Sequence, residues 1–189
     1  MPEKERTGDL GISLPPSPRA CLCLLDKHAV PAPVRAHSRV VARLSGRLAD
    51  ELHKAGSEEL DRSLIVAAAL LHDISKAIPG GPGDHAAAGG DLLRRLGLES
   101  VAAIVERHID LGRWNPAGPV TEEEVVFYCD KRVLHEEVVP LEHRFKDLLE
   151  RYGSVHAGAV AMISGTRSTA LALEGKIFRR LPYGPDRLR

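Results

Sequence analysis

The sequence has few cysteines, few aromatic side chains and no long apolar run. Its three cysteines are an odd number, and Cys21 and Cys23 would point in different directions on a helix. This pattern argues against a disulfide framework or a zinc knuckle and favours a reducing compartment. No apolar run approaches the roughly 18 residues of a membrane span, and the charged residues 3–6 are unlike a secretory signal. We therefore expect a cytoplasmic protein with no membrane partner.

An excess of charge of either sign is also absent. The chain has 26 lysines and arginines against 26 aspartates and glutamates. Balanced charge argues against a polyanion-binding surface that covers a whole face, while it leaves room for a local basic pocket. We therefore expect no extended nucleic-acid surface.

Aromatic residues make up only 4% of the chain, whereas alanine and leucine are abundant, and this composition favours helices. No alternating pattern of useful length predicts a strand, and the chain has no internal repeat. Apolar residues instead recur at helical spacing, which predicts an all-α fold. The helical segments are expected near residues 18–28, 34–56, 60–73, 85–96, 99–108, 121–152 with a kink or break at Pro140, and 155–180.

These helices suit one domain, since 189 residues are enough to bury a full core. Residues 1–17 combine charges, glycines and prolines and are expected to be disordered. Residues 18–180 are expected to form the domain, and residues 181–189 a flexible tail. The glycine-rich segment 79–83 fits no phosphate-binding fingerprint, so we expect a flexible connector there.

Eight apolar residues, Leu64 to Leu71, run without a break into His72 and Asp73, and Lys76 follows three positions later. A run this apolar is expected to be buried, so it carries a carboxylate into the interior. An unpaired buried carboxylate costs several kcal/mol, and the usual remedy is a partner charge or a metal ion. The central question is therefore which groups meet Asp73.

Other polar residues also fall on the apolar faces of predicted helices. Together with His72 and Asp73 they come from five helices and are expected to face a common interior. A single histidine on an apolar face is more often a hydrogen-bonded core residue than a ligand, but six such groups favour a metal site. Imidazole and carboxylate ligands suit iron, manganese or zinc, and Asp73 could bridge two ions. The six candidate ligands are His37, His72, Asp73, His85, His108 and Asp130.

This ordered set resembles the defining residues of the HD-domain metal-dependent phosphohydrolase superfamily, of the HDIG type. The segment from Leu70 to Lys76 is similar to the HD-x-x-K form of its motif, and His85 and His108 match the extra histidines of dinuclear members. The order His, His-Asp, His, His, Asp resembles that of small bacterial HD proteins that split symmetrical dinucleoside tetraphosphates. The resemblance covers roughly residues 19–152 and implies an HD-domain helical bundle.

The resemblance also implies how the ligands divide between two divalent metals, with iron or manganese expected and zinc, nickel or cobalt as alternatives. One metal would be held by His37, His72, Asp73 and Asp130, and the other by Asp73, His85 and His108. A metal-activated water would then cleave a phosphate ester or phosphoanhydride of a nucleotide-like substrate. The expected partner is a small phosphorylated substrate, and a homodimer is left open.

Basic residues near the ligands are candidates for substrate contact. Lys76 lies one helical turn beyond Asp73, and we assign these two residues catalytic roles, with Lys76 holding a phosphate. The alternative role of Lys76 is to stabilise a helix C-terminus. Arg113, Lys131 and Arg132 are further candidates for substrate binding, against ordinary surface and loop roles.

Two other functions remain open from the sequence. The mixed-valence di-iron oxygenases of the HD superfamily use a closely similar ligand set and cleave carbon bonds with dioxygen. A non-catalytic HD sensor would keep the fold without the reaction. The complete ligand set and Lys76 favour the phosphohydrolase over both.

Overall fold

The computed structural model describes residues 14–76, 84–155 and 157–188. Within these ranges it has eight α-helices, one two-stranded hairpin and one short 3₁₀ helix, so the all-α prediction is confirmed. Most of the expected disordered segment 1–17 and all of the expected connector 79–83 lie outside the described residues. The elements are α1 (Pro18–Lys27), α2 (Ala32–Lys54), α3 (Arg62–Leu71), α4 (Asp84–Arg95), α5 (Glu99–Glu106), α6 (Glu122–Lys131), β1 (Val133–Leu134), β2 (Glu137–Val138), α7 (Leu141–Tyr152), α8 (Ala159–Phe178) and η1 (Pro185–Arg187).

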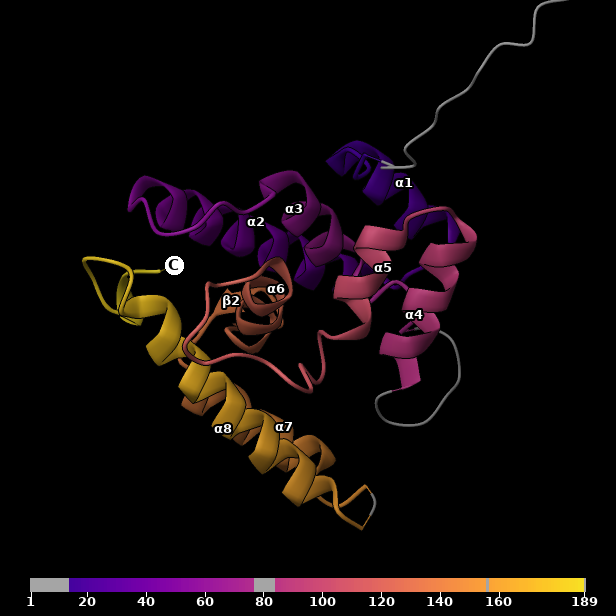
Figure 1. The fold of residues 1–189 in the computed structure, drawn as a ribbon. Coiled ribbons are helices and arrows are strands. Elements are labelled where there is room, and N and C mark those ends of the chain that lie inside the picture. Colours follow the sequence, from indigo (N-terminus) through magenta and orange to yellow (C-terminus); the bar gives the residue numbers. More distant parts are fainter. Residues whose placement is uncertain (1–13, 77–83, 156, 189) are drawn as a thin grey trace, which may run out of the picture.

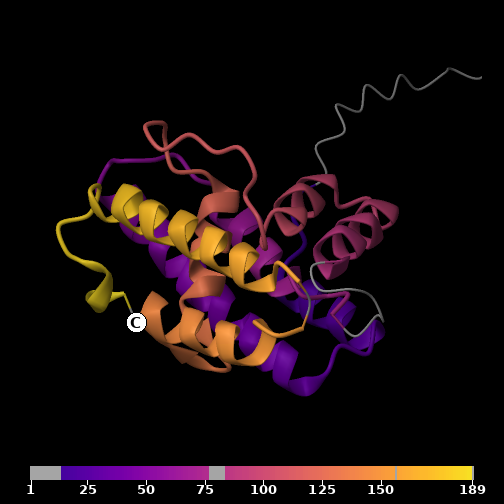
Figure 2. The same cartoon turned by 90° about the horizontal axis from the view of Figure 1, so that it is seen from below.

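Helix α6 is the central element. Figures 1 and 2 show it between the pair formed by α2 and α3 and the pair formed by α7 and α8, and it contacts all four of these helices. Every residue from Glu124 to Lys131 is buried, so α6 has no solvent-exposed face over this length. A helix buried all round is expected to be apolar. The polar residues that α6 nevertheless carries must therefore find partners inside the protein.

Three helix boundaries that position candidate ligands differ from the prediction, and one is the end of α5 at Glu106, which leaves His108 in the turn after this helix. Helix α3 ends at Leu71, so His72 and Asp73 lie in the turn that follows and not on the helix. The segment 121–152, predicted to be helical with a kink or break at Pro140, is interrupted earlier by the β1–β2 hairpin, and α7 begins after Pro140. His135 adopts a left-handed backbone conformation with φ of 55° between the two strands, which allows the tight turn. Strands of two residues are too short to leave an alternating pattern in the sequence.

The C-terminal segment packs onto the fold. The sequence predicts a flexible tail over 181–189, whereas the structure buries Leu181 and leaves Leu188 with 0% exposure. The backbone carbonyl of Pro185 accepts hydrogen bonds from the guanidinium of Arg132. None of the described helices is long and apolar enough to cross a membrane.

A buried ion pair joins α6 to α8. Lys176 Nζ lies 2.7 Å from both carboxylate oxygens of Glu124, and the two side chains are 1% and 3% exposed. Lys176 also donates to the carbonyl of Asn115 at 2.8 Å and lies over the ring of Trp114. Because every partner is inside the protein, this pair ties together two helices and the loop before α6.

Breaking this pair on one side is expected to destabilise the protein strongly. Lys176→Met leaves the Glu124 carboxylate buried without its cation, which typically costs about 3–5 kcal/mol. The double variant Lys176→Met with Glu124→Gln should recover part of that loss, because no uncompensated charge remains. Urea denaturation of the two variants measures both effects.

The matched control is Lys146→Met. Lys146 pairs with Glu150 at 3.9 Å on the surface of α7, with both side chains more than 60% exposed. An exposed pair contributes about 0–1 kcal/mol, so this variant should stay close to the wild type. A Lys176→Met variant no less stable than Lys146→Met would contradict a structural role for the buried pair.

Candidate metal centre

The six candidate ligands predicted from the sequence lie together in the structure. Helix α2 supplies one, the turn after α3 two, α4 one, the turn after α5 one and α6 one. All are buried except His85, which is partly exposed. In chain order they are His37, His72, Asp73, His85, His108 and Asp130.

Close packing of α4 brings His85 to this cluster. A Cβ atom at Gly89 would lie 3.2 Å from both Ser75 Oγ and Val105 Cγ1, so the absence of a side chain lets α4 approach the turn after α3 and helix α5. Ser75 Oγ donates to the carbonyl of His85 at 2.5 Å and holds the start of α4 against the same turn. As a result His85 Nε2 lies 3.3 Å from Asp73 Oδ1.

The two oxygens of Asp73 face two different groups of imidazoles. Oδ2 lies 3.4 Å from His72 Nε2, whereas Oδ1 lies 3.3 Å from His85 Nε2 and 3.7 Å from His108 Nε2. Two triads have ligand atoms within 4.8 Å of one another: His37, His72 and Asp73, and Asp73, His85 and His108. Among the described residues, Asp73 is the member that the two triads share.

Asp130 completes the side of the cluster near α2. Its Oδ1 lies 3.0 Å from His37 Nε2 and 3.6 Å from His72 Nε2. The rings of His37 and His72 have centroids 5.4 Å apart, so one ion could contact both. The triad on this side does not include Asp130, and the division of the ligands between two metals stays a prediction.

Backbone carbonyls fix the orientation of three of the imidazoles. Nδ1 of His72 lies 2.8 Å from the carbonyl of Ala69, and Nδ1 of His108 lies 2.6 Å from the carbonyl of Val105. Nδ1 of His37 lies 3.0 Å from the carbonyl of His135, in the hairpin turn. A carbonyl only accepts, so Nδ1 carries the proton and a neutral ring turns the Nε2 lone pair into the cluster. Metal-binding histidines are typically held in this way.

The same geometry leaves two buried atoms without a hydrogen bond. They are Nε2 of His72 and Oδ1 of Asp73. An imidazole lone pair that faces a carboxylate oxygen at 3.3–3.7 Å is repelled unless a cation lies between them. A proton or a metal ion can supply that positive charge, and a nitrogen and oxygen donor set of this kind fits a divalent transition metal.

The charges of the cluster shift its pKa values in a consistent way. Burial by itself lowers the pKa of His72, but the carboxylates of Asp73 and Asp130 outweigh burial and raise it. Burial by itself raises the pKa of Asp73, but His72, His85 and Lys76 outweigh burial and hold the pKa well below its usual value. Burial and the charge of His72 lower the pKa of His108 to about 3, so this imidazole is neutral at neutral pH. Asp73 is ionised and His108 is a ready neutral ligand.

A pocket of about 530 Å³ opens onto the cluster and contains two of the predicted substrate-binding lysines. Lys76 Nζ lies 2.6 Å from Asp73 Oδ2, and this carboxylate outweighs burial and raises the lysine's pKa. Lys131 Nζ lies 2.7 Å from Asp130 Oδ2 and donates to the carbonyl of His108 at 2.7 Å. Each lysine is therefore bound to a carboxylate of the cluster.

The other two predicted substrate-binding residues lie elsewhere. Arg132 is 3% exposed, and its guanidinium donates to the carbonyl of Val139 and the hydroxyl of Tyr128. This places it between α6, β2 and the C-terminal segment, where it holds structure together. Neither Arg132 nor Arg113 lines the pocket at the cluster.

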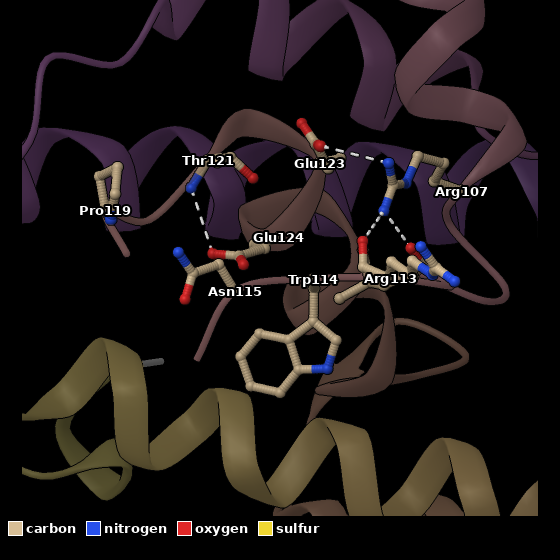
Figure 3. A pocket seen from close by; sticks show the side chains of 9 residues that line it. Arg107, Arg113, Trp114, Asn115, Pro119, Thr121, Glu123 and Glu124 are labelled. Carbon is tan, nitrogen blue, oxygen red and sulfur yellow. Dashed lines mark hydrogen bonds and ion pairs between the residues drawn. The ribbon is translucent and has the colours of Figure 1, made fainter. Parts of the chain in front are cut away.

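Arg113 borders a second, smaller hollow of about 190 Å³ (Figure 3). There Arg107 donates to the carbonyls of Leu111 and Arg113 and lies 3.8 Å from a carboxylate oxygen of Glu123. Figure 3 shows Trp114 beside these groups. Because Arg107 donates to two carbonyls of the loop between α5 and α6, it fastens this loop.

The sequence analysis missed Arg144, which lines the pocket at the cluster. Its position on α7 is three residues after Leu141 and one before Phe145, both of which are buried. That spacing places Arg144 on the buried face of the helix, and this was the available signal. The residues predicted to bind substrate instead all lie close in sequence to a candidate metal ligand.

Comparison with known proteins gives one family and several relatives. The family model described as HD domain matches residues 34–152. The tRNA (cytidine(56)-2'-O)-methyltransferase of Thermoplasma volcanium is 30% identical over 166 residues, covering 77% of this chain and 47% of that protein. The enzyme of the same name from Picrophilus torridus is 28% identical over 150 residues, with coverage of 72% and 41%. Ribonuclease Y of Chlorobium phaeobacteroides is 34% identical over 88 residues, with coverage of 46% and 16%. No solved structure matches.

These relatives correct one prediction and limit what can be transferred. The chain spans less than half the length of each of the three. Two of them are named for a tRNA substrate, and the expectation of no extended nucleic-acid surface is therefore wrong. The error arose because net charge sums over the whole molecule and says nothing of how basic residues are distributed.

The matched region contains all six clustered residues, from His37 to Asp130, together with the helices that hold them. The match to the family model agrees with the helical fold and with the His72-Asp73 pair, and this chain belongs to the HD domain family.

Proposed function

We propose that this protein is a metal-dependent phosphohydrolase that holds two divalent ions at the cluster around Asp73. The observation that carries the proposal is the orientation of the imidazoles: Nδ1 is fixed by a backbone carbonyl, and Nε2 faces a carboxylate that offers no proton. Asp73 would bridge the ions through its two oxygens. Iron or manganese is the proposed metal, since imidazole and carboxylate ligands suit both.

The proposed reaction is cleavage of a phosphate ester or phosphoanhydride. Bound divalent ions supply a water of lowered pKa and stabilise charge on phosphoryl oxygens. His108 stays neutral at neutral pH and so remains a ligand. Lys76, partly exposed at the mouth of the pocket, would exchange its contact with Asp73 for a substrate phosphate once metal neutralises that carboxylate.

The proposed substrate class is a phosphate attached to a nucleotide unit, whether in a free nucleotide or in RNA. The pocket of about 530 Å³ has room for one such unit. The likeness to ribonuclease Y and to two tRNA methyltransferases is the reason to include RNA. The tetraphosphatase resemblance seen in the sequence stays a prediction.

Metal content tests the centre directly. After anaerobic purification with iron or manganese, the wild type is expected to hold about two ions per chain, His85→Ala about one, and Asp73→Ala less than about 0.2. Loss of Asp73 removes a ligand from both triads, whereas loss of His85 affects one. Elemental analysis measures the ratio. His53→Ala, at an exposed position on α2, serves as the control and should match the wild type. Two ions in His85→Ala would contradict the dinuclear centre.

Activity is tested by phosphate and nucleotide release from a panel of substrates, with oxygen uptake recorded in parallel. The panel contains nucleoside phosphates, a dinucleoside tetraphosphate and an oligoribonucleotide. Hydrolysis of at least one substrate is expected, and Asp73→Ala should abolish it. Oxygen uptake without hydrolysis would instead support the di-iron oxygenase reading. Metal binding with neither reaction would support a sensor.

Lys76→Gln separates a phosphate contact from a structural role. Removing one charge-assisted hydrogen bond to substrate should raise KM about tenfold or more and leave metal content unchanged. Steady-state kinetics on the substrate found in the panel measure this change. Lys146→Gln, which removes an exposed lysine on α7, is the control. If Lys76→Gln lowers only the melting temperature, Lys76 acts on the fold and not on substrate.

A further inference from the structure

The wall of the pocket opposite the metal ligands comes from α7 and α8. These two helices pack side by side (Figures 1 and 2) and reach the pocket through one guanidinium and several apolar or aromatic side chains. The residues from this wall are Arg144, Phe145, Leu148, Tyr152, Ile163 and Thr166. The pocket thus has a charged end at the metal centre and an apolar end at this wall.

Arg144 is the unusual member of the wall. It is only 9% exposed, and its Nε is buried and makes no hydrogen bond within the protein. Its Nη1 donates to Asp147 Oδ2 at 3.1 Å, and that carboxylate is shared with Arg151. A buried guanidinium with an unsatisfied N–H is costly, and such a group calls for an acceptor outside the protein.

The other cations at the pocket are already engaged. Lys76 and Lys131 lie 2.6 and 2.7 Å from carboxylates of the metal centre. Arg144 lines the same pocket, pairs with no carboxylate of the metal centre and keeps one N–H donor, Nε, unsatisfied. A planar guanidinium matches the oxygens of a phosphate better than any other side chain does.

The surface next to Arg144 suits a planar organic group. Phe145 is buried against the core, whereas Tyr152 is 42% exposed at the rim, and Leu148 lies between them along α7. Aromatic and aliphatic surface of this kind stacks a nucleobase and gives little to a bare sugar. The wall therefore offers one donor for an anion and a neighbouring surface for a base.

We propose that the guanidinium of Arg144 binds a phosphate oxygen of the substrate, with a turn of the side chain that brings the buried Nε to the pocket, and that Tyr152 and its apolar neighbours hold the base. This inference rests on the proposed function and assigns the phosphate and the base of its nucleotide unit to named residues of this wall. Arg144 is a substrate-binding residue in this proposal and has no part in holding metal.

Binding of two probes to metal-loaded protein tests the proposal without turnover. Calorimetry compares inorganic phosphate and adenosine 5′-monophosphate on the wild type, R144Q and R151Q. R144Q is expected to weaken both probes about 10- to 100-fold, the loss of one or two charge-assisted hydrogen bonds. R151Q is the matched control for inorganic phosphate, because Arg151 lies on the same helix and pairs with the same Asp147 but is 42% exposed and off the pocket. Its guanidinium lies 5.3 Å from the centroid of the Tyr152 ring, so Lys146→Gln, at an exposed position on the same helix, is the control for adenosine 5′-monophosphate. Equal binding by R144Q and R151Q would overturn the role of Arg144.

A second variant keeps the test decisive if R144Q does not fold. If R144Q is unfolded by circular dichroism, R144K decides the question, because lysine keeps the charge but lacks the Nε donor. Weakening of about tenfold in R144K relative to R151Q supports the proposal, and unchanged binding overturns it.

The base-binding part of the proposal is tested separately. Tyr152→Ala is expected to weaken adenosine 5′-monophosphate about tenfold and to leave ribose 5-phosphate and inorganic phosphate unchanged, since stacking contributes about 1–3 kcal/mol per base. Equal losses of affinity for adenosine 5′-monophosphate and ribose 5-phosphate would overturn the assignment of the base to this wall. A wild type that binds no metal refutes the proposed function itself, whereas a hydrolytically active wild type with unaffected R144Q refutes only this inference.

Discussion

The buried carboxylate of Asp73 is the constraint on which the rest of the structure depends. It is 2% exposed and stays ionised because positive and polar groups surround it on every side. Its two oxygens face different imidazoles, so no single partner compensates it. Five helices converge on this one charge. How these helices pack therefore depends on which groups balance the charge of Asp73. A metal ion held at Asp73 would in this sense be part of the core.

Helix ends, more than helix faces, build the centre. His72 and His108 lie in the turns just after α3 and α5, and each turns Nδ1 back to a carbonyl of the last helical turn. The last four carbonyls of a helix lack intrahelical partners, so each helix end both positions an imidazole and selects its tautomer. The β1–β2 hairpin does the same for His37 through the carbonyl of His135. The ligands are thus oriented by backbone atoms, which substitutions elsewhere disturb little.

The sequence predicted the helical fold and the residues that meet at the centre, because both follow from helical periodicity. His37, His85 and Asp130 fall on apolar faces, and the fold must bring such faces together. What escaped prediction depends on geometry that periodicity does not encode. A two-residue strand pair leaves no pattern. Arg132 lies two residues after the candidate ligand Asp130, but the end of α6 turns it toward Tyr128. Arg144 lines the pocket from α7, a helix that carries no candidate ligand.

Two clusters of buried charge separate structural from functional roles. Lys176 and Glu124 satisfy each other completely: Nζ meets both carboxylate oxygens and a carbonyl, with no atom of the pair left over. The centre at Asp73 differs, because Asp73 Oδ1 and His72 Nε2 have no hydrogen-bond partner beside a pocket. Arg144 Nε, on the wall of that pocket formed by α7, also has no hydrogen-bond partner. Unsatisfied buried atoms are costly to keep. Three such atoms, Asp73 Oδ1, His72 Nε2 and Arg144 Nε, belong to the cluster or to residues that line its pocket, and they support the proposal that a ligand binds there.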